Sequence, residues 1–182
     1  MIVLIGQSCA GKSTIEKALC KDLEIDRIIS YTSRPIRINE IDGIDYHYIT
    51  DDEFYKKILD GFFAESTTYN GWNYGIAKED CKDNSIVVVE PFGYRSLKKD
   101  KDLNIVSFYI WTEERERVVR MMERGDKVME SFRRIISDQG GFNGVYLEVD
   151  YKIDNERGKL NEAINNIKSI LKDIRRYNGG TK

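Results

Sequence analysis

The first residues constrain the fold more than any other stretch of the chain. An apolar run at 2–5 is followed by a loop with a glycine at each end, and then by apolar residues at helical spacing. The loop matches the pattern G-x-x-x-x-G-K-[ST], with Gly6, Gly11, Lys12 and Ser13 at the specified positions. Strand, loop and helix therefore occur in the order that a phosphate-binding loop requires, which predicts an α/β protein built on that loop.

Each residue type in this loop has a physical role in binding phosphate. Glycine permits positive φ angles and close approach of the backbone to a ligand, and the N-terminus of the following helix favours an anion. Lys12 supplies a mobile positive charge for the outer phosphates, and the Ser13 hydroxyl is a predicted ligand of Mg²⁺. An ordinary glycine-rich turn would not explain these two residues. The candidate ATP-binding residues are Gly6, Ser8, Cys9, Ala10, Gly11, Lys12, Ser13 and Thr14.

The composition limits the class of protein. A chain of 182 residues with 41% hydrophobic and 33% charged residues suits one globular domain. The net charge of −2 gives no basic footprint for nucleic acid, and no apolar run approaches the ~18 residues that span a membrane. Three cysteines without metal-type spacing favour a reducing compartment and no disulfide. Because the first strand begins at residue 2, no signal peptide is expected, and the predicted location is the cytoplasm.

The chain changes character after its first strand and helix. Residues 31–81 hold much of the aromatic content and alternate apolar with polar positions, which predicts small antiparallel strands. Thr50 and Glu53 form a predicted capping box for a short helix in this region. Elsewhere strands alternate with helices, which is typical of a mainly parallel sheet flanked by helices. We therefore expect a β-rich subdomain inserted into a core made of residues 1–30, 82–112 and 146–178.

Residues 113–145 carry many of the basic side chains. Thr112 is a predicted N-cap, because acidic residues follow it in the first turn of a helix. Two helices are expected, with a break near Gly125. Arg115 and Arg117 are interpreted as solvated residues on a helix face laced by i,i+4 pairs.

Arg34 and Arg37 flank a turn-favouring proline and predict a second anion site. Guanidinium groups bind phosphate oxygens through paired hydrogen bonds, so these two residues suit a fixed clamp on the phosphate of a second ligand. Two solvated surface arginines are the alternative, and the residues alone leave both interpretations open.

With these motifs in place, the sequence resembles the guanylate kinase family. The resemblance covers nearly the whole chain in order, and its middle blocks are the specific part because many kinases share the loop. Six features carry it: the phosphate loop; Ser30-x-x-x-Arg34-x-x-Arg37; Glu40-x-Asp42-Gly43-x-Asp45-Tyr46-His47-Tyr48; Glu65; Asn73-Tyr74-Gly75; and Arg120-x-x-x-Arg124-Gly125.

The resemblance implies a nucleoside-monophosphate-binding subdomain at 31–81, an arginine-bearing lid at 113–145, and transfer of the ATP γ-phosphoryl group to GMP or dGMP with Mg²⁺. The implied partners are small nucleotides, and a monomer and a homodimer are both open. The implied acceptor-binding residues are Ser30, Arg34, Arg37, Tyr46, Glu65, Tyr74 and Glu90. The implied catalytic residues are Lys12, Arg34, Arg120, Arg124 and Arg134, and the implied metal-binding residues are Ser13 and Glu90.

Glu65 has a chemical reason to recognise guanine. Guanine presents N1–H and N2–H₂ side by side, and one carboxylate can accept both hydrogen bonds, whereas adenine lacks that pair of donors. The resemblance assigns Ser30 to the same base. The residues before Glu65, Phe62-Phe63-Ala64, suit the apolar edge of a pocket.

The sequence departs from the family at two places. Where the family usually has I-D-x-Q-G, this chain has Val89-Glu90-Pro91-Phe92-Gly93, and a second acid of many members is replaced by Val88. These departures bear on metal handling and on the choice of acceptor. The later lid arginine falls at Arg133 or Arg134, and we expect one of the two to reach the transferring phosphoryl group.

Two other functions are weighed against this one. A related kinase could act on a different phosphorylated acceptor, but it would not need Ser30 and Glu65. A non-catalytic guanylate-kinase-like binding module typically has a damaged phosphate loop, and here Lys12 and its neighbours are intact. The single histidine, His47, is interpreted as structural, since transfer to a phosphate requires no general base.

Overall fold

The computed structural model describes residues 1–38 and 40–179, without the side chains of 175–179. Its contacts divide the chain into two compact units. Unit 1 comprises Met1–Ile5 and Ile25–Ser107, and unit 2 comprises Gly6–Glu24 and Phe108–Lys182. The chain passes from unit 1 into unit 2 at the start of the phosphate loop, between Ile5 and Gly6.

Unit 1 contains a set of parallel strands with β7 between β1 and β2. Both β1 and β7 are runs of buried, mostly β-branched residues, as strands covered on both faces require. The helix α3 begins at a proline, whose fixed φ suits the first helical turn, and it contacts β1 and β5. The elements are β1 (Ile2–Ile5), β2 (Asp26–Arg27), β7 (Ser85–Val88), α3 (Pro91–Lys99) and the start of β8 (Val106–Trp111).

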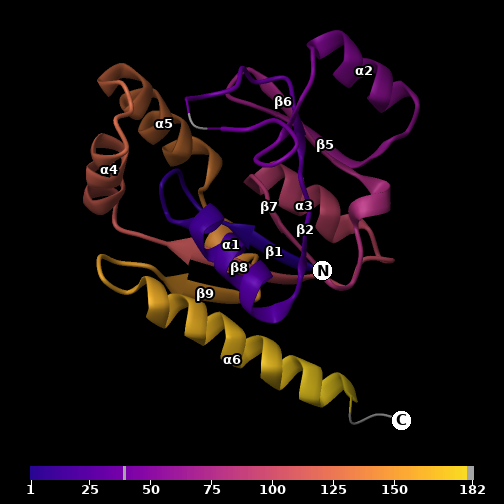
Figure 1. The fold of residues 1–182 in the computed structure, drawn as a ribbon, viewed down its shortest axis with the longest axis vertical. Coiled ribbons are helices and arrows are strands. Elements are labelled where there is room, and N and C mark those ends of the chain that lie inside the picture. The colour runs from indigo at the N-terminus through magenta and orange to yellow at the C-terminus, as the bar shows by residue number, and fades with distance from the viewer. Residues whose placement is uncertain (39, 180–182) are drawn as a thin grey trace. The chain divides into compact units, whose positions relative to one another are not determined.

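A second sheet in unit 1 has the strand order β4-β3-β6-β5, and its strands β5 and β6 are labelled in Figure 1. The capping box predicted for the short helix is confirmed, since Thr50 Oγ1 accepts from Glu53 N at 3.2 Å and Glu53 Oε2 accepts from Thr50 N at 2.8 Å. Phe54 on that helix stacks on Phe63 of β5. The elements are β3 (Tyr31–Thr32), β4 (His47–Tyr48), α2 (Asp51–Leu59), β5 (Phe63–Tyr69), β6 (Trp72–Ala77) and the 3₁₀ turn η1 (Lys78–Asp80).

Unit 2 holds the remainder of β8, which pairs in parallel with β9. Its helix α1 packs against the long C-terminal helix α6, with Ile15, Leu19 and Ile167 fully buried, and α4 contacts α5. Its elements are α1 (Lys12–Leu23), α4 (Glu114–Glu123), α5 (Val128–Gly141), the 3₁₀ turn η2 (Val145–Leu147), β9 (Tyr151–Asp154) and α6 (Leu160–Gly179).

The predicted fold class, a parallel sheet flanked by helices, is confirmed. Two local predictions are wrong. The strands β3 and β4 are parallel rather than antiparallel. The segment between them returns the chain to the end of the sheet where β3 begins, so both strands run in the same direction. Thr112 does not cap α4, whose N-cap is Glu113. Across the described residues, none of the helices is both long enough and apolar enough to cross a membrane.

Candidate active site

The phosphate loop follows β1 and lies in unit 2, where side chains hold its carbonyl groups. Lys12 Nζ donates hydrogen bonds to the carbonyl oxygens of Gly6 and Gln7, the second at 3.0 Å. Arg117 Nη1 donates to the carbonyl oxygen of Ser8 at 3.4 Å. Lys12 begins α1 and Arg117 lies on α4, so two helices hold the first half of the loop.

The next two carbonyl groups of the loop are held in the same way. Arg120 Nη1 donates to Cys9 O at 3.3 Å, and Asn155 Nδ2 donates to Ala10 O at 2.7 Å. In a planar trans peptide, a carbonyl and the following amide point in opposite directions. The carbonyl groups of all five residues from Gly6 to Ala10 are therefore held by side chains. As a result, the Cys9 amide points away from Arg117, and the Gly11 amide points away from Asn155.

The two glycines of the loop pattern are required by close contacts. A Cβ atom on Gly11, which has φ +94°, would lie 2.3 Å from Asn155 Nδ2. A Cβ atom on Gly6 would lie 2.4 Å from the backbone oxygen of Ile110. Both distances are far below van der Waals contact, so only glycine fits at either end of the loop.

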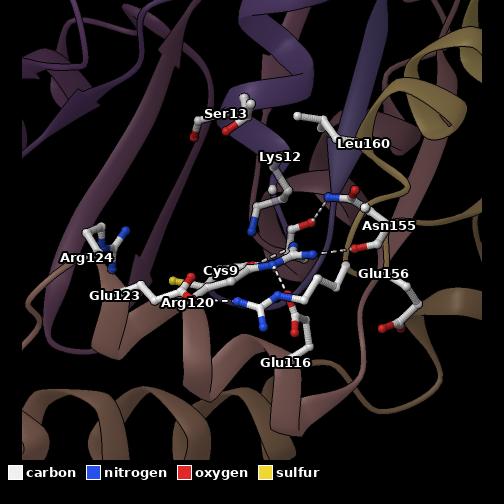
Figure 2. A pocket seen from close by; sticks show the side chains of 15 residues that line it. Cys9, Lys12, Ser13, Glu116, Arg120, Glu123, Arg124, Asn155, Glu156 and Leu160 are labelled. Atoms are coloured by element: carbon white, nitrogen blue, oxygen red, sulfur yellow. Dashed lines mark hydrogen bonds and ion pairs between the residues drawn. The ribbon is translucent and has the colours of Figure 1, made fainter.

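A cavity of about 440 Å³ opens at this loop (Figure 2). Its size falls in the range of small-ligand sites, which is roughly 300–1,000 Å³. The loop and first helical turn line it from Cys9 to Thr14, α4 lines a second side, and the residues after β9 line a third. Gly6 and Ser8, which were predicted ATP-binding residues, are not part of the lining.

The predicted lid arginines fall into two groups. Arg120 and Arg124 both line the cavity, and Arg120 bridges the loop and the Asn155 carbonyl (Figure 2). Arg134 does not line it: its guanidinium is buried and bonded to Glu130 at 3.0 Å and Asp126 at 3.3 Å. A catalytic role for Arg134 stays a prediction, and it would require release from these two carboxylates.

Arg117 was expected to be solvated, and this prediction is wrong. Its side chain is 1% exposed and forms an ion pair with Asp138 at 2.9 Å. A charged group of this kind is buried only when it is paired, and the partner lies 21 residues later on another helix, beyond any local pattern. Arg115 is exposed, as expected.

The predicted acceptor clamp lies in unit 1 and is anchored by Arg34. Arg34 is 5% exposed, and its two terminal nitrogens donate to the two oxygens of Glu40 at 3.0 and 2.9 Å. Its guanidinium carbon lies 5.4 Å from the centre of the Tyr46 ring and 5.7 Å from that of Tyr48. The alternative that Arg34 is a solvated surface residue is therefore wrong, because it is fixed by a carboxylate and two aromatic faces.

Glu40 organises the rest of this cluster. It accepts a hydrogen bond from the Arg37 backbone amide at 2.8 Å and one from the Tyr48 hydroxyl at 2.7 Å. Burial alone would raise the pKa of Glu40, but these bonds and those from Arg34 outweigh burial and hold the pKa below its usual value. Glu40 therefore stays ionised and holds both arginines of the clamp in place.

Tyr74 completes the cluster from β6. Its ring lies 6.1 Å from that of Tyr46. Burial raises the pKa of the Tyr74 phenol, while the nearby charges of Arg34 and Glu90 act on it in opposite directions. Unit 1 thus brings together five of the predicted acceptor-binding residues, Arg34, Arg37, Tyr46, Tyr74 and Glu90.

Glu65 lies on β5 and is 5% exposed. Its Oε2 atom is buried and, within the described chain, has no hydrogen-bond partner. Burial raises the pKa of Glu65 to about 7. The backbone of α3 approaches it closely, since a Cβ atom on Gly93 would lie 3.0 Å from Oε2. Such a carboxylate is costly to ionise until a ligand supplies N–H donors.

Three residues of the site were missed by sequence reasoning. Asn155 and Asp138 contact the loop from segments far along the chain, and no spacing rule connects them to it. Glu40 belongs to a motif of the family resemblance, but no role was assigned to it. Its position three residues after Arg37 was a signal that the two side chains could form an ion pair.

Comparisons with known proteins give a consistent result. The guanylate kinase family model matches residues 1–174. Guanylate kinases from Clostridium perfringens and Mycoplasma mobile are each 30% identical, over 96% and 94% of this chain and 80% and 92% of their own lengths. A crystal structure of guanylate kinase from Anaplasma phagocytophilum is also similar, and the match covers 95% of this chain and 84% of that protein. The TM-score is 0.71 and the sequence identity is 21%, so this likeness is one of fold.

Proposed function

The chain belongs to the guanylate kinase family, and from this membership we propose that it transfers the γ-phosphoryl group of ATP to GMP or dGMP, giving ADP and GDP or dGDP. The observation that carries the proposal is Glu65. A buried carboxylate oxygen without a protein partner in the described structure suits the paired N–H donors of guanine. The arginine and tyrosine cluster around Glu40 lies in the same unit and suits the phosphate of that nucleotide.

ATP is proposed to occupy the cavity at the loop. The amides directed by the held carbonyls, together with Lys12 and the positive end of α1, suit the phosphates. Arg120 and Arg124 line the same cavity and add positive charge. Asn155 Oδ1 is buried without a partner among the described residues, and it suits the exocyclic amine of adenine.

Mg²⁺ is proposed to arrive with the ATP phosphates. Within residues 1–38 and 40–179, no group of three acidic, histidine or cysteine side chains forms a metal cage. This fits a cation that takes one or two protein ligands and completes its shell with phosphate and water. The exposed Ser13 hydroxyl is the proposed ligand in unit 2, and Glu90 is the proposed ligand in unit 1. When bound, Mg²⁺ neutralises charge on the phosphates.

The remaining groups position the acceptor and stabilise charge. Arg34 and Arg37 pair with the acceptor phosphate, and the Tyr46 and Tyr74 hydroxyls donate hydrogen bonds to it. No general base is needed, because the attacking phosphate oxygen is already anionic. We propose that residues 31–81 form the acceptor-binding subdomain. Residues 113–145 form the proposed lid, whose closure excludes water.

A product analysis tests the reaction itself. The protein is incubated with ATP, Mg²⁺ and GMP, and the nucleotides are separated by ion-exchange chromatography. We expect GDP and ADP to form in equal amounts. ADP without GDP would show ATP hydrolysis instead of transfer and would contradict the proposal.

Gly93→Ala tests how closely the backbone of α3 fits the guanine-binding carboxylate. The added Cβ would press on both oxygens of Glu65, at 3.0 and 3.1 Å. We expect the KM for GMP to rise about 10-fold, the effect of losing roughly 1.4 kcal/mol of binding, with the KM for ATP unchanged. The control must be a glycine without a positive φ, which excludes Gly71 at +77°. Gly140→Ala meets this requirement, because it adds a methyl group in open space on α5.

A further inference from the structure

A buried ion pair lies beside the phosphate loop but outside the cavity lining. Arg117 comes from α4 and Asp138 from α5, and each side chain is 1% exposed. Removing two charges from water costs several kcal/mol per ion, and their attraction compensates only when further hydrogen bonds complete the geometry. The partners of this pair therefore indicate what it does.

Both members of the ion pair are hydrogen-bonded to Ser8 of the phosphate loop. The Ser8 amide donates to Asp138 Oδ2 at 2.8 Å, and the Ser8 hydroxyl donates to Oδ1 at 3.3 Å. The Ser8 carbonyl accepts from Arg117 at 3.4 Å. All three hydrogen-bonding groups of one loop residue are thus bonded to the ion pair.

The residue that follows shows why the loop needs an anchor at this point. Cys9 has φ 59°, a left-handed conformation that is unfavourable for a non-glycine residue. Such conformations persist where the surroundings over-determine them. Ser8 is fixed immediately before Cys9, and Arg120 holds the Cys9 carbonyl.

We propose that Asp138, neutralised by Arg117, is a positioning residue that holds the loop at Ser8 so that the amides of Cys9 and Gly11 are arranged before ATP binds. The proposal rests on ATP as the ligand of the adjacent cavity. Pre-arranged donors avoid the ordering cost that a mobile loop would bear on binding. Arg117 has a second effect, because it offsets a negative charge that would otherwise repel the phosphates.

Two double variants separate positioning from a structural role. Arg117→Met/Asp138→Leu replaces the pair with apolar side chains of similar volume, a change that buried ion pairs often tolerate. Arg117→Met/Asp138→Asn also removes both charges but keeps an acceptor for the Ser8 amide. We expect the leucine variant to bind Mg·ATP about 10-fold more weakly than the wild type, because the Ser8 amide and hydroxyl lose their acceptor. The asparagine variant should recover most of the affinity.

The measurement is the Kd of Mg·ATP by isothermal titration calorimetry, with thermal unfolding and the KM for GMP alongside. GMP affinity should match the wild type in both variants. Lys168→Met, which removes an ion pair with Asp22 between α6 and α1, is the control and should leave ATP affinity unchanged. Equal ATP affinity in the two folded double variants, or wild-type affinity in the leucine variant, would overturn the proposal. Because ATP binding is measured without an acceptor, absence of GMP phosphorylation would count only against the proposed reaction.

Discussion

Lys12→Ala is expected to abolish phosphoryl transfer while GMP still binds. Lys12 supplies a positive charge at the cavity and also bonds the carbonyl groups of Gly6 and Gln7. Removing one preorganised donor from a site of this kind typically costs about 10²–10³ in rate. Here the loop also loses two of its carbonyl contacts, so we expect a loss of about 10³-fold or more. The measurement is ADP release in the presence of ATP, Mg²⁺ and GMP.

Lys17→Ala provides the matched control for this variant. Lys17 lies five residues further along α1 with its side chain exposed, so its removal takes away the same charge without removing the hydrogen bonds to the loop carbonyls. GMP binding is measured by calorimetry in both variants and should be unchanged, because the proposed acceptor-binding residues lie in unit 1. An active Lys12→Ala enzyme would mean that the loop is not the ATP site.

Glu65→Gln is expected to lower kcat/KM for GMP by about 100-fold or more, since each hydrogen bond to a charged group contributes ~1.5–3 kcal/mol. The amide retains one acceptor but turns an N–H₂ donor toward a guanine donor. In the wild type, kcat/KM for GMP should fall as the pH drops through about 7, because the protonated acid cannot accept both bonds. The variant should lack this dependence on pH. Glu79→Gln, an exposed acid in the same unit, is the control.

The same substitution is expected to have the opposite effect on stability. Burial raises the pKa of Glu65 from 4.5 to about 7, so the folded state binds the proton more tightly than the unfolded state. This contribution to stability is complete below pH 4.5 and is lost as the pH rises through about 7. Relative to wild type, Glu65→Gln should therefore gain up to about 3 kcal/mol in free energy of unfolding between about pH 4.5 and pH 8.5.

Urea denaturation at the two pH values, without nucleotide, measures this gain. A stability difference between variant and wild type that is independent of pH would show that Glu65 is ionised at little cost. That result would contradict the interpretation that the site is completed only by a guanine base.

Features that depend on neighbouring residues were predictable from the sequence. The phosphate loop, the Thr50 capping box and the apolar faces of the helices are encoded within a few residues, and the structure contains each of them. Arg34 and Glu65, which the family resemblance singled out, are both buried, and their roles in binding an acceptor stay predictions.

Features that depend on long-range packing were not predictable in this way. Thr112 looked like a helix cap, but its hydroxyl is buried, 3.2 Å from Ala10 O and 3.0 Å from Asn155 O, and its single proton is shared between these two acceptors. Arg117 looked solvated because its partner, Asp138, belongs to another helix. In each case a tertiary contact satisfied a polar group that local rules assign to solvent or to a cap.

The most direct test of the central claim is the choice of acceptor. ADP release is measured by a coupled assay with ATP and Mg²⁺, offering GMP, dGMP, AMP, CMP and UMP in turn at equal concentration. We predict turnover with GMP and dGMP alone, since only guanine supplies both donors that Glu65 requires. Comparable turnover with AMP, or turnover with none of the five despite measurable ATP binding, would contradict the assignment.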